Sequence, residues 1–340
     1  MLFMKKQKSY SIDQCVLYKV GSKKRLADIL NIPLSSLLKL AKSKNNYRVF
    51  ELPFEQCEFT GKTKNARVVQ EPKKLLKAVH ARLQKLISRI EAPKYGHAAI
   101  KGRSYRSNAS EHISSVYLAT LDVRKFYPST RQSLVRNFFA DQLRCAPDVA
   151  DILTKLCCFF GASKTGGSVG LPTGSPLSPI LSLYANKPMF DKLQGYSNDN
   201  SLIFTCYVDD ITFSGEALPK DIVRKVGEIV YSYGHTIAVE KTKIFREKDT
   251  KHVTGVAIKN NRISVPHSRF KKARAIERII SNTPQEELAK KRTLQRKLAG
   301  LLGEAGFLDS RYKPWASRSY VDLKKLEYDF NQQSRQVDFK

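Results

Sequence analysis

The sequence offers little from which to build a disulfide framework, a zinc site or a membrane span. Its six cysteines include no Cys-x-x-Cys pair and no Cys/His pattern with the spacing of zinc ligands. No apolar run reaches the length of a membrane-spanning helix, and no apolar core follows the charges of the N-terminal stretch 1–14. We therefore predict a cytoplasmic protein with reduced, buried thiols and no membrane anchor.

Acidic residues are scarce relative to basic ones. Lys and Arg number 60 against 31 Asp and Glu, which gives a formal net charge of +29. With 340 residues, 41% of them hydrophobic, the chain can bury a core and form one large domain or two to three small ones. A foldable chain with this charge is expected to bind a polyanion such as nucleic acid. The alternative is a merely basic soluble protein.

The chain is organised around the stretch SLIFTCYVDDITFSG, residues 201–215. Apolar and β-branched residues flank Asp209 and Asp210, a pattern typical of a β-hairpin that presents two carboxylates at its turn. Mg²⁺ prefers oxygen ligands and is usually held by one or two carboxylates together with substrate phosphates. The pair therefore predicts a divalent-metal site, and the alternative is a solvated turn, because Asp is common in turns.

A third carboxylate lies upstream, in the strand-length apolar run VYLATLDV. A carboxylate at the end of a buried strand is unfavourable unless it is paired or metal-bound. We therefore expect Asp122 to join Asp209 and Asp210 as a metal ligand. Tyr127 follows closely and is placed to wall the sugar of an incoming nucleotide, although an ordinary core aromatic would give the same pattern.

Candidate phosphate-binding groups come from two places. YRVFELP and NARVVQEP predict two strands joined by a polar stretch, with Lys64 and Arg67 positioned to grip a triphosphate or, alternatively, to form a solvated basic edge. Farther along, the glycine-rich stretch 161–174 leads into a helix, where backbone N–H groups with Ser175 and Ser178 suit phosphate binding. This stretch lacks the spacing of a Walker loop.

The N-terminal part predicts a small helical module. Residues 21–43 give two short helical patterns separated at 31–33. A packing or RNA-contacting module fits them better than a DNA-reading helix-turn-helix, because nothing in the pattern identifies a recognition helix.

The C-terminal third predicts a basic, largely helical region. Residues 235–245 read as a strand carrying Lys241, residues 251–266 read as a second hairpin, and the pattern from Phe270 is helical with breaks near 283–284 and 313–315. Residues 241–300 contain 17 Lys and Arg against 5 Asp and Glu. This excess makes the region the best candidate for the main grip on RNA or DNA.

Taken in order, these motifs resemble a reverse transcriptase, and within that family a bacterial retron reverse transcriptase. The match covers roughly residues 45–280, and the segments that carry it are Arg67 to Pro72, Leu121-Asp122 through Tyr127-Pro128-Ser129, Leu171 to Pro179 and Tyr207-Val208-Asp209-Asp210. Two narrower matches are typical of retron enzymes: Asn108 to His112 fits Asn-Ala-x-x-His, and Val253-Thr254-Gly255 fits Val-Thr-Gly. Taken singly, these two stretches could be a helix cap and a strand running into a turn.

The resemblance implies an α+β right-hand polymerase fold whose palm carries the carboxylates on an antiparallel sheet. The expected division is an N-terminal helical segment at 1–44, fingers at 45–100, a palm with fingers insertions at 101–260 and a helical, RNA-binding thumb at 261–340. One departure stands out: many reverse transcriptases have Gln at the position of Thr173, where that side chain touches the incoming nucleotide.

The resemblance also implies RNA-templated DNA synthesis with two Mg²⁺ ions. Asp122, Asp209 and Asp210 are the expected metal ligands, and Lys241 is expected to protonate or neutralise the leaving group. The expected nucleotide-binding residues are Lys64, Arg67, Tyr127, Thr173 and Gly174. The expected RNA-binding residues are Asn108, His112, Val253, Thr254, Gly255, Lys271 and Lys272.

The expected partners are dNTPs, a dedicated structured noncoding RNA, its DNA copy and an effector protein of the same antiphage system. Synthesis is expected to start from a guanosine 2′-hydroxyl and to give a branched RNA–DNA product. Two alternatives stay open: another defence-associated or group II intron-like reverse transcriptase, and a non-catalytic RNA–DNA scaffold that restrains an effector.

Overall fold

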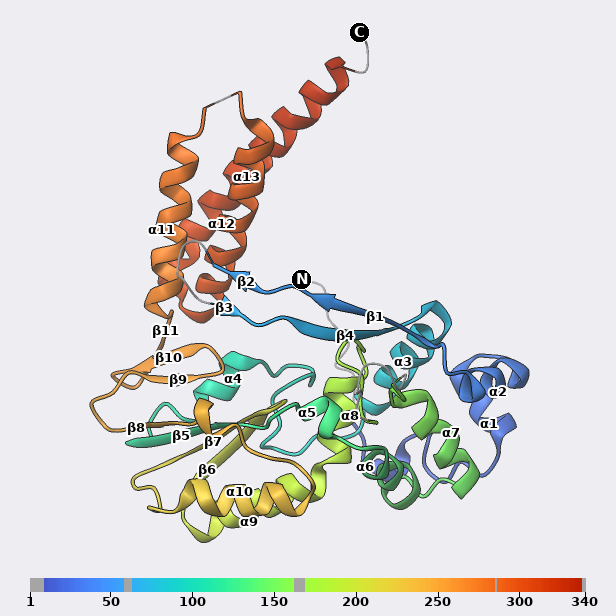
Figure 1. The fold of residues 1–340 in the computed structure, drawn as a ribbon. Coiled ribbons are helices and arrows are strands. Elements are labelled where there is room, and N and C mark those ends of the chain that lie inside the picture. The colour runs from blue at the N-terminus through green and yellow to red at the C-terminus, as the bar shows by residue number, and fades with distance from the viewer. Residues whose placement is uncertain (1–8, 58–62, 162–168, 285, 338–340) are drawn as a thin grey trace. The chain divides into compact units, whose positions relative to one another are not determined.

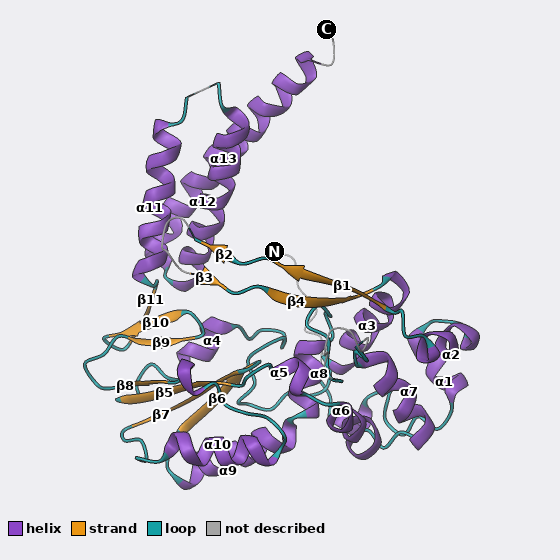
Figure 2. Ribbon diagram, in the orientation of Figure 1, coloured by secondary structure: helices purple, strands orange, loops and turns teal. Residues whose placement is uncertain are grey.

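The chain forms two compact units that both combine helices with antiparallel strands (Figures 1 and 2), as the predicted α+β class requires. The computed structural model describes residues 9–57, 63–161, 169–284 and 286–337. The larger unit comprises Met1–Pro53 and Ala66–Lys248, and the smaller comprises Phe54–Asn65 and Asp249–Lys340. Within the described residues, no helix has both the length and the apolar character needed to cross a membrane.

The N-terminal helices of the larger unit form as the sequence predicts. A short turn, η1 (Ile12–Gln14), precedes α1 (Lys23–Leu30) and α2 (Leu34–Lys42). The Ser22 hydroxyl caps α1 by accepting the Arg25 N–H at 3.2 Å, and Asn31 ends this helix in the left-handed conformation with φ 55°. The apolar side of both helices is buried in the main core, so the module serves packing.

The larger unit contains an antiparallel sheet of order β6-β7-β5-β8. Its strands are β5 (Tyr117–Asp122), β6 (Ile203–Tyr207), β7 (Asp210–Gly215) and β8 (Lys243–Phe245). Helices α9 (Lys187–Asp199) and α10 (Ile222–Ser232) lie together on one side of the sheet in Figure 1. They bury the apolar side of the hairpin strands, which leaves the strand ends free to present polar groups.

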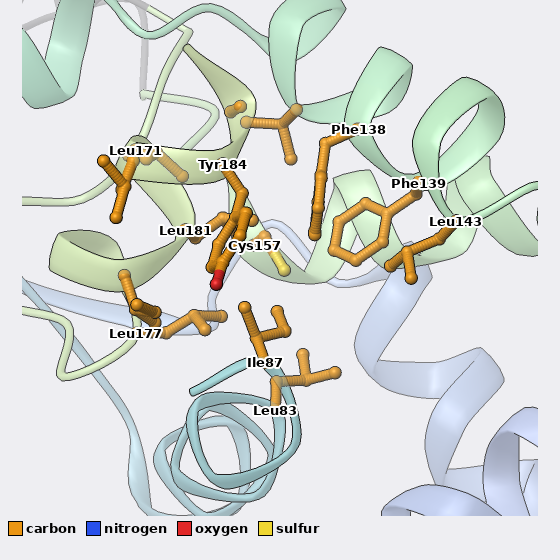
Figure 3. Close-up of a cluster of buried hydrophobic side chains, with 14 of the residues drawn as sticks. Leu83, Ile87, Phe138, Phe139, Leu143, Cys157, Leu171, Leu177, Leu181 and Tyr184 are labelled. Carbon is orange, nitrogen blue, oxygen red and sulfur yellow. The ribbon is translucent and has the colours of Figure 1, made fainter. Parts of the chain in front are cut away.

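Beside the sheet, a helical core surrounds Tyr184 (Figure 3). The Tyr184 ring stacks on Phe138 with centroids 5.6 Å apart, and its hydroxyl donates to the Ile90 carbonyl at 2.9 Å. The helices of this part are α3 (Lys74–Ile87), α4 (Tyr105–Ser110), α5 (Phe126–Ser129), α6 (Gln132–Asn137), η2 (Phe138–Gln142), α7 (Pro147–Cys157) and α8 (Ser178–Ala185).

A two-stranded ribbon completes the larger unit. Strands β1 (Tyr47–Leu52) and β4 (Arg67–Pro72) pair antiparallel, with Leu52 opposite Arg67. These are the two strands predicted from the sequence. Between them in the chain, β2 (Glu55–Gln56) and β3 (Thr63–Lys64) pair within the smaller unit.

The smaller unit contains a strand meander followed by three long helices. Strands β9 (Lys251–Val253), β10 (Val256–Lys259) and β11 (Arg262–Ser264) form a sheet, one strand more than the predicted hairpin. Helices α11 (His267–Asn282), α12 (Leu288–Leu308) and α13 (Lys313–Val337) follow, with the turn η5 (Ser310–Tyr312) before the last. Pro314 lies in the first turn of α13, where a missing N–H is harmless.

The prediction of one strand over residues 235–245 is wrong in part. Only Ile237 forms a bridge, to Val123, and the chain then makes a 3₁₀ turn, η4 (Val239–Lys241), before β8 begins. The alternation of apolar residues suggested a strand, but Val239 is 67% exposed and Lys241 is drawn toward Asp122.

Candidate active site

Three carboxylates meet where β5 pairs with β7. Asp122 ends β5 and lies directly opposite Asp210, the first residue of β7. Residues that face each other in an antiparallel pair project to the same side of the sheet. Asp209 occupies the turn between β6 and β7, and its carbonyl accepts the Val123 N–H at 3.0 Å. The sheet register therefore brings together the three acidic residues predicted from the sequence.

The turn that holds Asp209 is strained. Tyr207 pairs with Asp210, so Val208 and Asp209 are the only residues of the loop, and Val208 has φ 61°. A β-branched residue with positive φ is an outlier, and such strain persists only where the surroundings enforce it.

The carboxylates repel one another, as the pKa directions show. The pKa of Asp210 is raised to about 7, first by burial and then by the charges of Asp209 and Asp122. Burial is also the main cause that raises the pKa of Asp209, with Asp122 adding to it. Partly buried oxygen donors with surplus negative charge are the donor set that a hard divalent cation requires.

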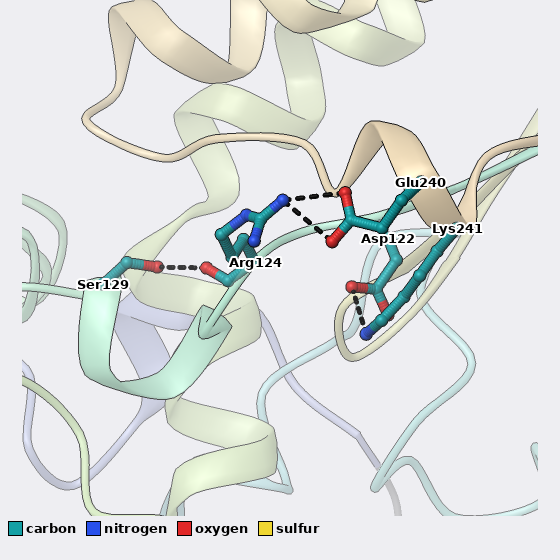
Figure 4. A network of polar contacts seen from close by, with 5 residues as sticks. All are labelled: Asp122, Arg124, Ser129, Glu240 and Lys241. Atoms are coloured by element: carbon teal, nitrogen blue, oxygen red, sulfur yellow. Dashed lines mark hydrogen bonds and ion pairs between the residues drawn. The ribbon is translucent and has the colours of Figure 1, made fainter. Parts of the chain in front are cut away.

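Lys241 supplies part of the missing positive charge. Its Nζ lies 2.8 Å from Asp122 Oδ1 (Figure 4), and this hydrogen bond is the main cause that raises the pKa of Lys241. Beside it, Arg124 donates to both oxygens of Glu240, at 2.8 and 2.7 Å (Figure 4). Across the described part of the chain, no three His, Cys, Asp or Glu side chains surround a common metal position. The oxygen atoms of the three carboxylates are nevertheless the type of ligand that a divalent metal ion prefers, and Lys241 is hydrogen-bonded to one of them, Asp122.

Tyr127 faces this acidic cluster from α5. The pKa of its phenol is raised by burial first, and then by the charges of Asp209 and Tyr207. Its carbonyl accepts the Leu171 N–H at 3.0 Å, which joins α5 to the chain that leads to Thr173. The charge of Asp209 reaches this half-buried ring, so Tyr127 lies near the carboxylates, and its contact with a nucleotide sugar stays a prediction.

Thr173 and Gly174 lie against strand β4. The Thr173 hydroxyl donates to the Val68 carbonyl at 3.2 Å, and the Gly174 N–H donates to the Gln70 carbonyl at 3.1 Å. A Cβ on Gly174 would come within 2.8 Å of the Gln70 carbonyl oxygen, so the close approach requires glycine here. Exposed Arg67 begins the same strand.

Gln70 is a site residue that the sequence analysis missed. Its Oε1 accepts the Thr173 N–H at 3.1 Å and the Thr173 hydroxyl at 2.9 Å. The side chain is therefore fixed beside the residue that stands where many reverse transcriptases have glutamine. No local signal could have identified this pair, because the two residues are 103 positions apart in the chain.

The remaining predicted residues lie elsewhere. Lys64 belongs to β3 of the smaller unit, whereas Arg67 belongs to the larger one. Asn108 and His112 are fully buried in the larger unit. His112 bridges the Ser214 hydroxyl at 2.6 Å and the Thr205 hydroxyl at 2.7 Å, so it supports the carboxylate hairpin from inside. Direct contact of these two buried side chains with RNA would first require them to be uncovered.

The Val-Thr-Gly stretch forms the turn between β9 and β10. Val253 is buried, while Thr254 and Gly255 occupy the loop with φ 46° and 77°. Positive φ at both loop residues matches the twist of a two-residue hairpin. Lys271 and Lys272 lie on α11 of the same unit.

Part of the glycine-rich stretch, residues 162–168, lies outside the described residues. Five of the six cysteines, Cys15, Cys145, Cys157, Cys158 and Cys206, are buried as predicted, whereas Cys57 is only half-buried.

Comparison with known proteins gives consistent matches. The family model described as "Reverse transcriptase (RNA-dependent DNA polymerase)" matches residues 57–258. The retron Ec86 reverse transcriptase of Escherichia coli is 27% identical over 232 residues, which are 67% of this chain and 68% of that protein. The retron Se72 reverse transcriptase of Salmonella heidelberg (strain 579083-10) is 28% identical over 242 residues, or 67% and 61% of the two chains. The retron Ec83 reverse transcriptase of Escherichia coli is 24% identical over 295 residues, or 82% and 90%.

Proposed function

The chain belongs to the reverse transcriptase family and is an RNA-directed DNA polymerase, and from this premise we propose that it copies part of a dedicated structured noncoding RNA into DNA. The resemblance to bacterial retron reverse transcriptases expected from the sequence is confirmed. The observation that carries the catalytic proposal is the register that sets Asp122 opposite Asp210, with Asp209 in the adjoining turn.

Family membership implies the right-hand polymerase fold. Within it, we assign residues 45–100 to fingers, 101–260 to the palm and 261–340 to the thumb, after an N-terminal helical segment at 1–44. The carboxylate sheet supports the palm assignment, and the three long helices of the smaller unit support the thumb assignment.

Enzymes of this family use divalent metal ions, and we propose two Mg²⁺ ions held by Asp122 and Asp209 with Asp210 in support. When bound, such ions activate the attacking hydroxyl and stabilise the leaving pyrophosphate. The chain's own contribution is to hold three carboxylates together on a rigid sheet and to keep Lys241 beside them. Lys241 would neutralise or protonate the pyrophosphate as it leaves.

The nucleotide is proposed to lie between α5 and β4. Tyr127 would block a 2′-hydroxyl and so favour deoxynucleotides, while Arg67 would contact the triphosphate. A contact of Lys64, which belongs to the smaller unit, with the triphosphate stays a prediction from the sequence. Thr173, Gly174 and Gln70 would contact the nucleotide from the other side. Both described bonds from Thr173 to the Gln70 side chain go to its carbonyl oxygen, which leaves its NH₂ group to donate to a ligand.

The smaller unit is proposed to recognise the RNA. Thr254 and Gly255 present a turn backbone to solvent, and Lys271 and Lys272 lie on a helix in the strongly basic stretch 241–300. Shape-directed recognition through phosphates and 2′-hydroxyls suits such a surface. Asn108 and His112 would influence RNA binding only through the surface that they support.

Synthesis is proposed to begin at a guanosine 2′-hydroxyl, to yield a branched RNA–DNA product and to serve antiphage defence together with an effector protein in the cytoplasm. The retron reverse transcriptases among the relatives support this proposal. Two alternatives predict different products: a group II intron-like or other defence enzyme would yield heterogeneous DNA, and a non-catalytic scaffold would carry RNA alone.

The catalytic test is the double variant Asp209→Asn with Asp210→Asn. We expect loss of Mg²⁺-dependent dNTP incorporation on an RNA template by about 10³-fold or more, because metal-held carboxylates contribute several kcal/mol to such reactions. Asp141→Asn, an exposed carboxylate of the larger unit, is the matched control. Undiminished synthesis by the double variant would overturn the assignment. Sequencing the nucleic acid that copurifies with the chain separates the retron function from its two alternatives.

A further inference from the structure

The segment that carries Lys241 is attached to the carboxylate strand by backbone hydrogen bonds. The Arg124 N–H donates to the Thr236 carbonyl and the Ala238 N–H donates to the Asp122 carbonyl, both at 2.8 Å. Between these bonds, Val123 and Ile237 form an antiparallel bridge. Segment 235–241 therefore runs back along the strand end that holds Asp122 and delivers Lys241 to that carboxylate.

Apolar contacts hold only part of this segment. Ala238 is 1% exposed and Ile237 packs against the main core, whereas Val239 is 67% exposed. A cavity of about 520 Å³ is lined by Thr236, Ile237 and Val239, and a second cavity of about 540 Å³ is lined by Thr236 together with Arg124 and Ser129. Because of this open space, the polar contacts of the segment are needed to fix the position of Lys241.

The strongest of these contacts lies at the start of the segment. His235 is 1% exposed; its Nδ1 lies 2.7 Å from the Ser129 hydroxyl and its Nε2 lies 2.8 Å from Asn186 Oδ1. The Phe126 ring packs on the imidazole with centroids 5.5 Å apart. One histidine side chain therefore joins this segment to α5 and to the residue that ends α8.

The hydrogen bonds around Asn186 assign the tautomer of His235. Asn186 Nδ2 donates to the Thr130 hydroxyl and to the Ser182 carbonyl, both at 2.9 Å, so its Oδ1 must accept from His235. The proton is therefore on Nε2, and Nδ1 accepts from Ser129. Burial first, and then the charge of Arg131, lower the pKa of His235 to about 4, so the ring is neutral at physiological pH.

We propose that His235 is a positioning residue for nucleotidyl transfer: by fixing the start of segment 235–241, it holds the Lys241 ammonium at Asp122 when pyrophosphate leaves. In the reaction, the attacking hydroxyl oxygen forms a bond to the α-phosphorus and releases its proton to solvent water. The bond from the α-phosphorus to the bridging oxygen breaks, and its electron pair stays on pyrophosphate. Lys241 neutralises or protonates that charge, a role that rests on the proposed function.

Two further contacts extend the same attachment. Arg124 and Glu240 form a bidentate pair at 2.7 and 2.8 Å directly before Lys241 (Figure 4). The pair is exposed, so its removal should loosen the segment without disturbing the core. Arg124→Gln is therefore a second variant in case His235→Gln does not fold.

The test uses the full chain with its RNA and measures single-turnover incorporation of dNTPs whose β,γ-bridging oxygen is replaced by CH₂ or CF₂. These analogues differ in leaving-group basicity, so the slope of rate against leaving-group pKa reports how well the charge on pyrophosphate is neutralised. We expect Lys241→Gln to steepen this slope. His235→Gln should steepen it in the same direction and lower kcat about 10-fold, with KM for dNTP within about twofold, because a small misplacement of a catalytic group affects kcat first.

The matched control for the arginine variant is Arg136→Gln, which removes an exposed Arg–carboxylate pair between α6 and α7 that lines neither cavity beside segment 235–241, and it should leave the slope unchanged. An altered slope in Lys241→Gln with an unaltered slope in both His235→Gln and Arg124→Gln would overturn the positioning role. An unaltered slope in Lys241→Gln itself would overturn both that role and the assignment of Lys241, while the Asp209 and Asp210 test of the polymerase site would stand.

Discussion

The hairpins β6–β7 and β9–β10 both have two-residue loops that begin with a β-branched residue at positive φ, and they differ at the second residue. In β9–β10, Thr254 and Gly255 both adopt positive φ, the arrangement that two-residue hairpin loops favour. In β6–β7, only Val208 has positive φ, and Asp209, a proposed metal ligand, follows it. Each turn therefore holds a β-branched residue, Thr254 or Val208, in an unfavourable conformation, and the second loop residue is a glycine in the proposed RNA-binding unit and an aspartate in the proposed catalytic site.

The β6–β7 hairpin is held by a buried polar clamp. His112 bonds Thr205 of β6 and Ser214 of β7, and the Ser115 hydroxyl donates to Ser214 at 2.8 Å. An unfavourable backbone conformation persists only where other contacts over-determine it. The comparison teaches that the site is built by fixing the strands first and accepting strain at the turn.

The variant Gly255→Val should distinguish the functions of the two hairpins most clearly. Its φ of 77° is unfavourable for a β-branched residue, so the turn should distort. We expect about 10- to 100-fold weaker binding of the cognate RNA, or about 1.4 to 2.8 kcal/mol. Extension of a generic primer on an RNA template should stay within about twofold. Filter binding and primer extension measure the two effects.

Asn261→Gly is the matched control for that variant. Asn261 has φ 53° in the neighbouring β10–β11 turn, where glycine is compatible with the backbone. Equal losses of RNA binding and of primer extension in Gly255→Val would contradict the proposal that the β9–β10 hairpin serves RNA binding and the β6–β7 hairpin serves catalysis.

A second test asks whether Gln70, in the unit that carries the carboxylate hairpin, contributes to nucleotide binding and not to RNA binding. Gln70→Ala removes two hydrogen bonds to Thr173, each with a net contribution of about 1 kcal/mol. We expect KM for dNTP to rise about 10-fold in steady-state assays, with cognate RNA affinity unchanged. Thr173→Ser retains the hydroxyl and should stay close to the native KM. A KM unchanged by Gln70→Ala would remove this residue from the nucleotide pocket.

The contrast between the hairpins also explains what the sequence could predict. Strand-length runs with aspartates at their ends predicted β5, β6 and β7 and the meeting of Asp122 with Asp209 and Asp210. The Gln70–Thr173 and His235–Asn186 contacts could not be predicted, because each depends on how separate segments pack. The alternating apolar residues of segment 235–245 predict one strand, whereas the segment forms a bridge at Ile237, a 3₁₀ turn and then the short strand β8.

A smaller effect should appear in the pH dependence of stability. Burial lowers the pKa of His112 to about 3, so the folded chain keeps it neutral while the unfolded chain protonates it below about 6.5. The unfolded state then binds more protons, and the stability contributed by neutral His112 is fully present above pH 6.5 and falls as pH drops toward 3. His112→Gln should reduce the slope of the unfolding free energy against pH by up to about 1.4 kcal/mol per pH unit, which corresponds to one bound proton. Denaturant titrations between pH 7 and 4 measure it, and an unchanged slope would argue against the clamp.

The smallest expected effect concerns the backbone strain at Val208, in the turn that carries Asp209. Val208→Ala shortens the side chain to a methyl group and Val208→Gly removes it, so the difference between them reports the backbone preference with and without a Cβ atom. In an ordinary strand or helix, glycine is less stable than alanine. At φ 61° the order should reverse, with Val208→Gly more stable than Val208→Ala by about 1 kcal/mol. Because the same reasoning makes Gly255→Ala destabilising by a similar amount, thermal unfolding of all three variants compares the two turns directly. An ordinary order at Val208 would mean that the carboxylate turn stores no strain at this residue.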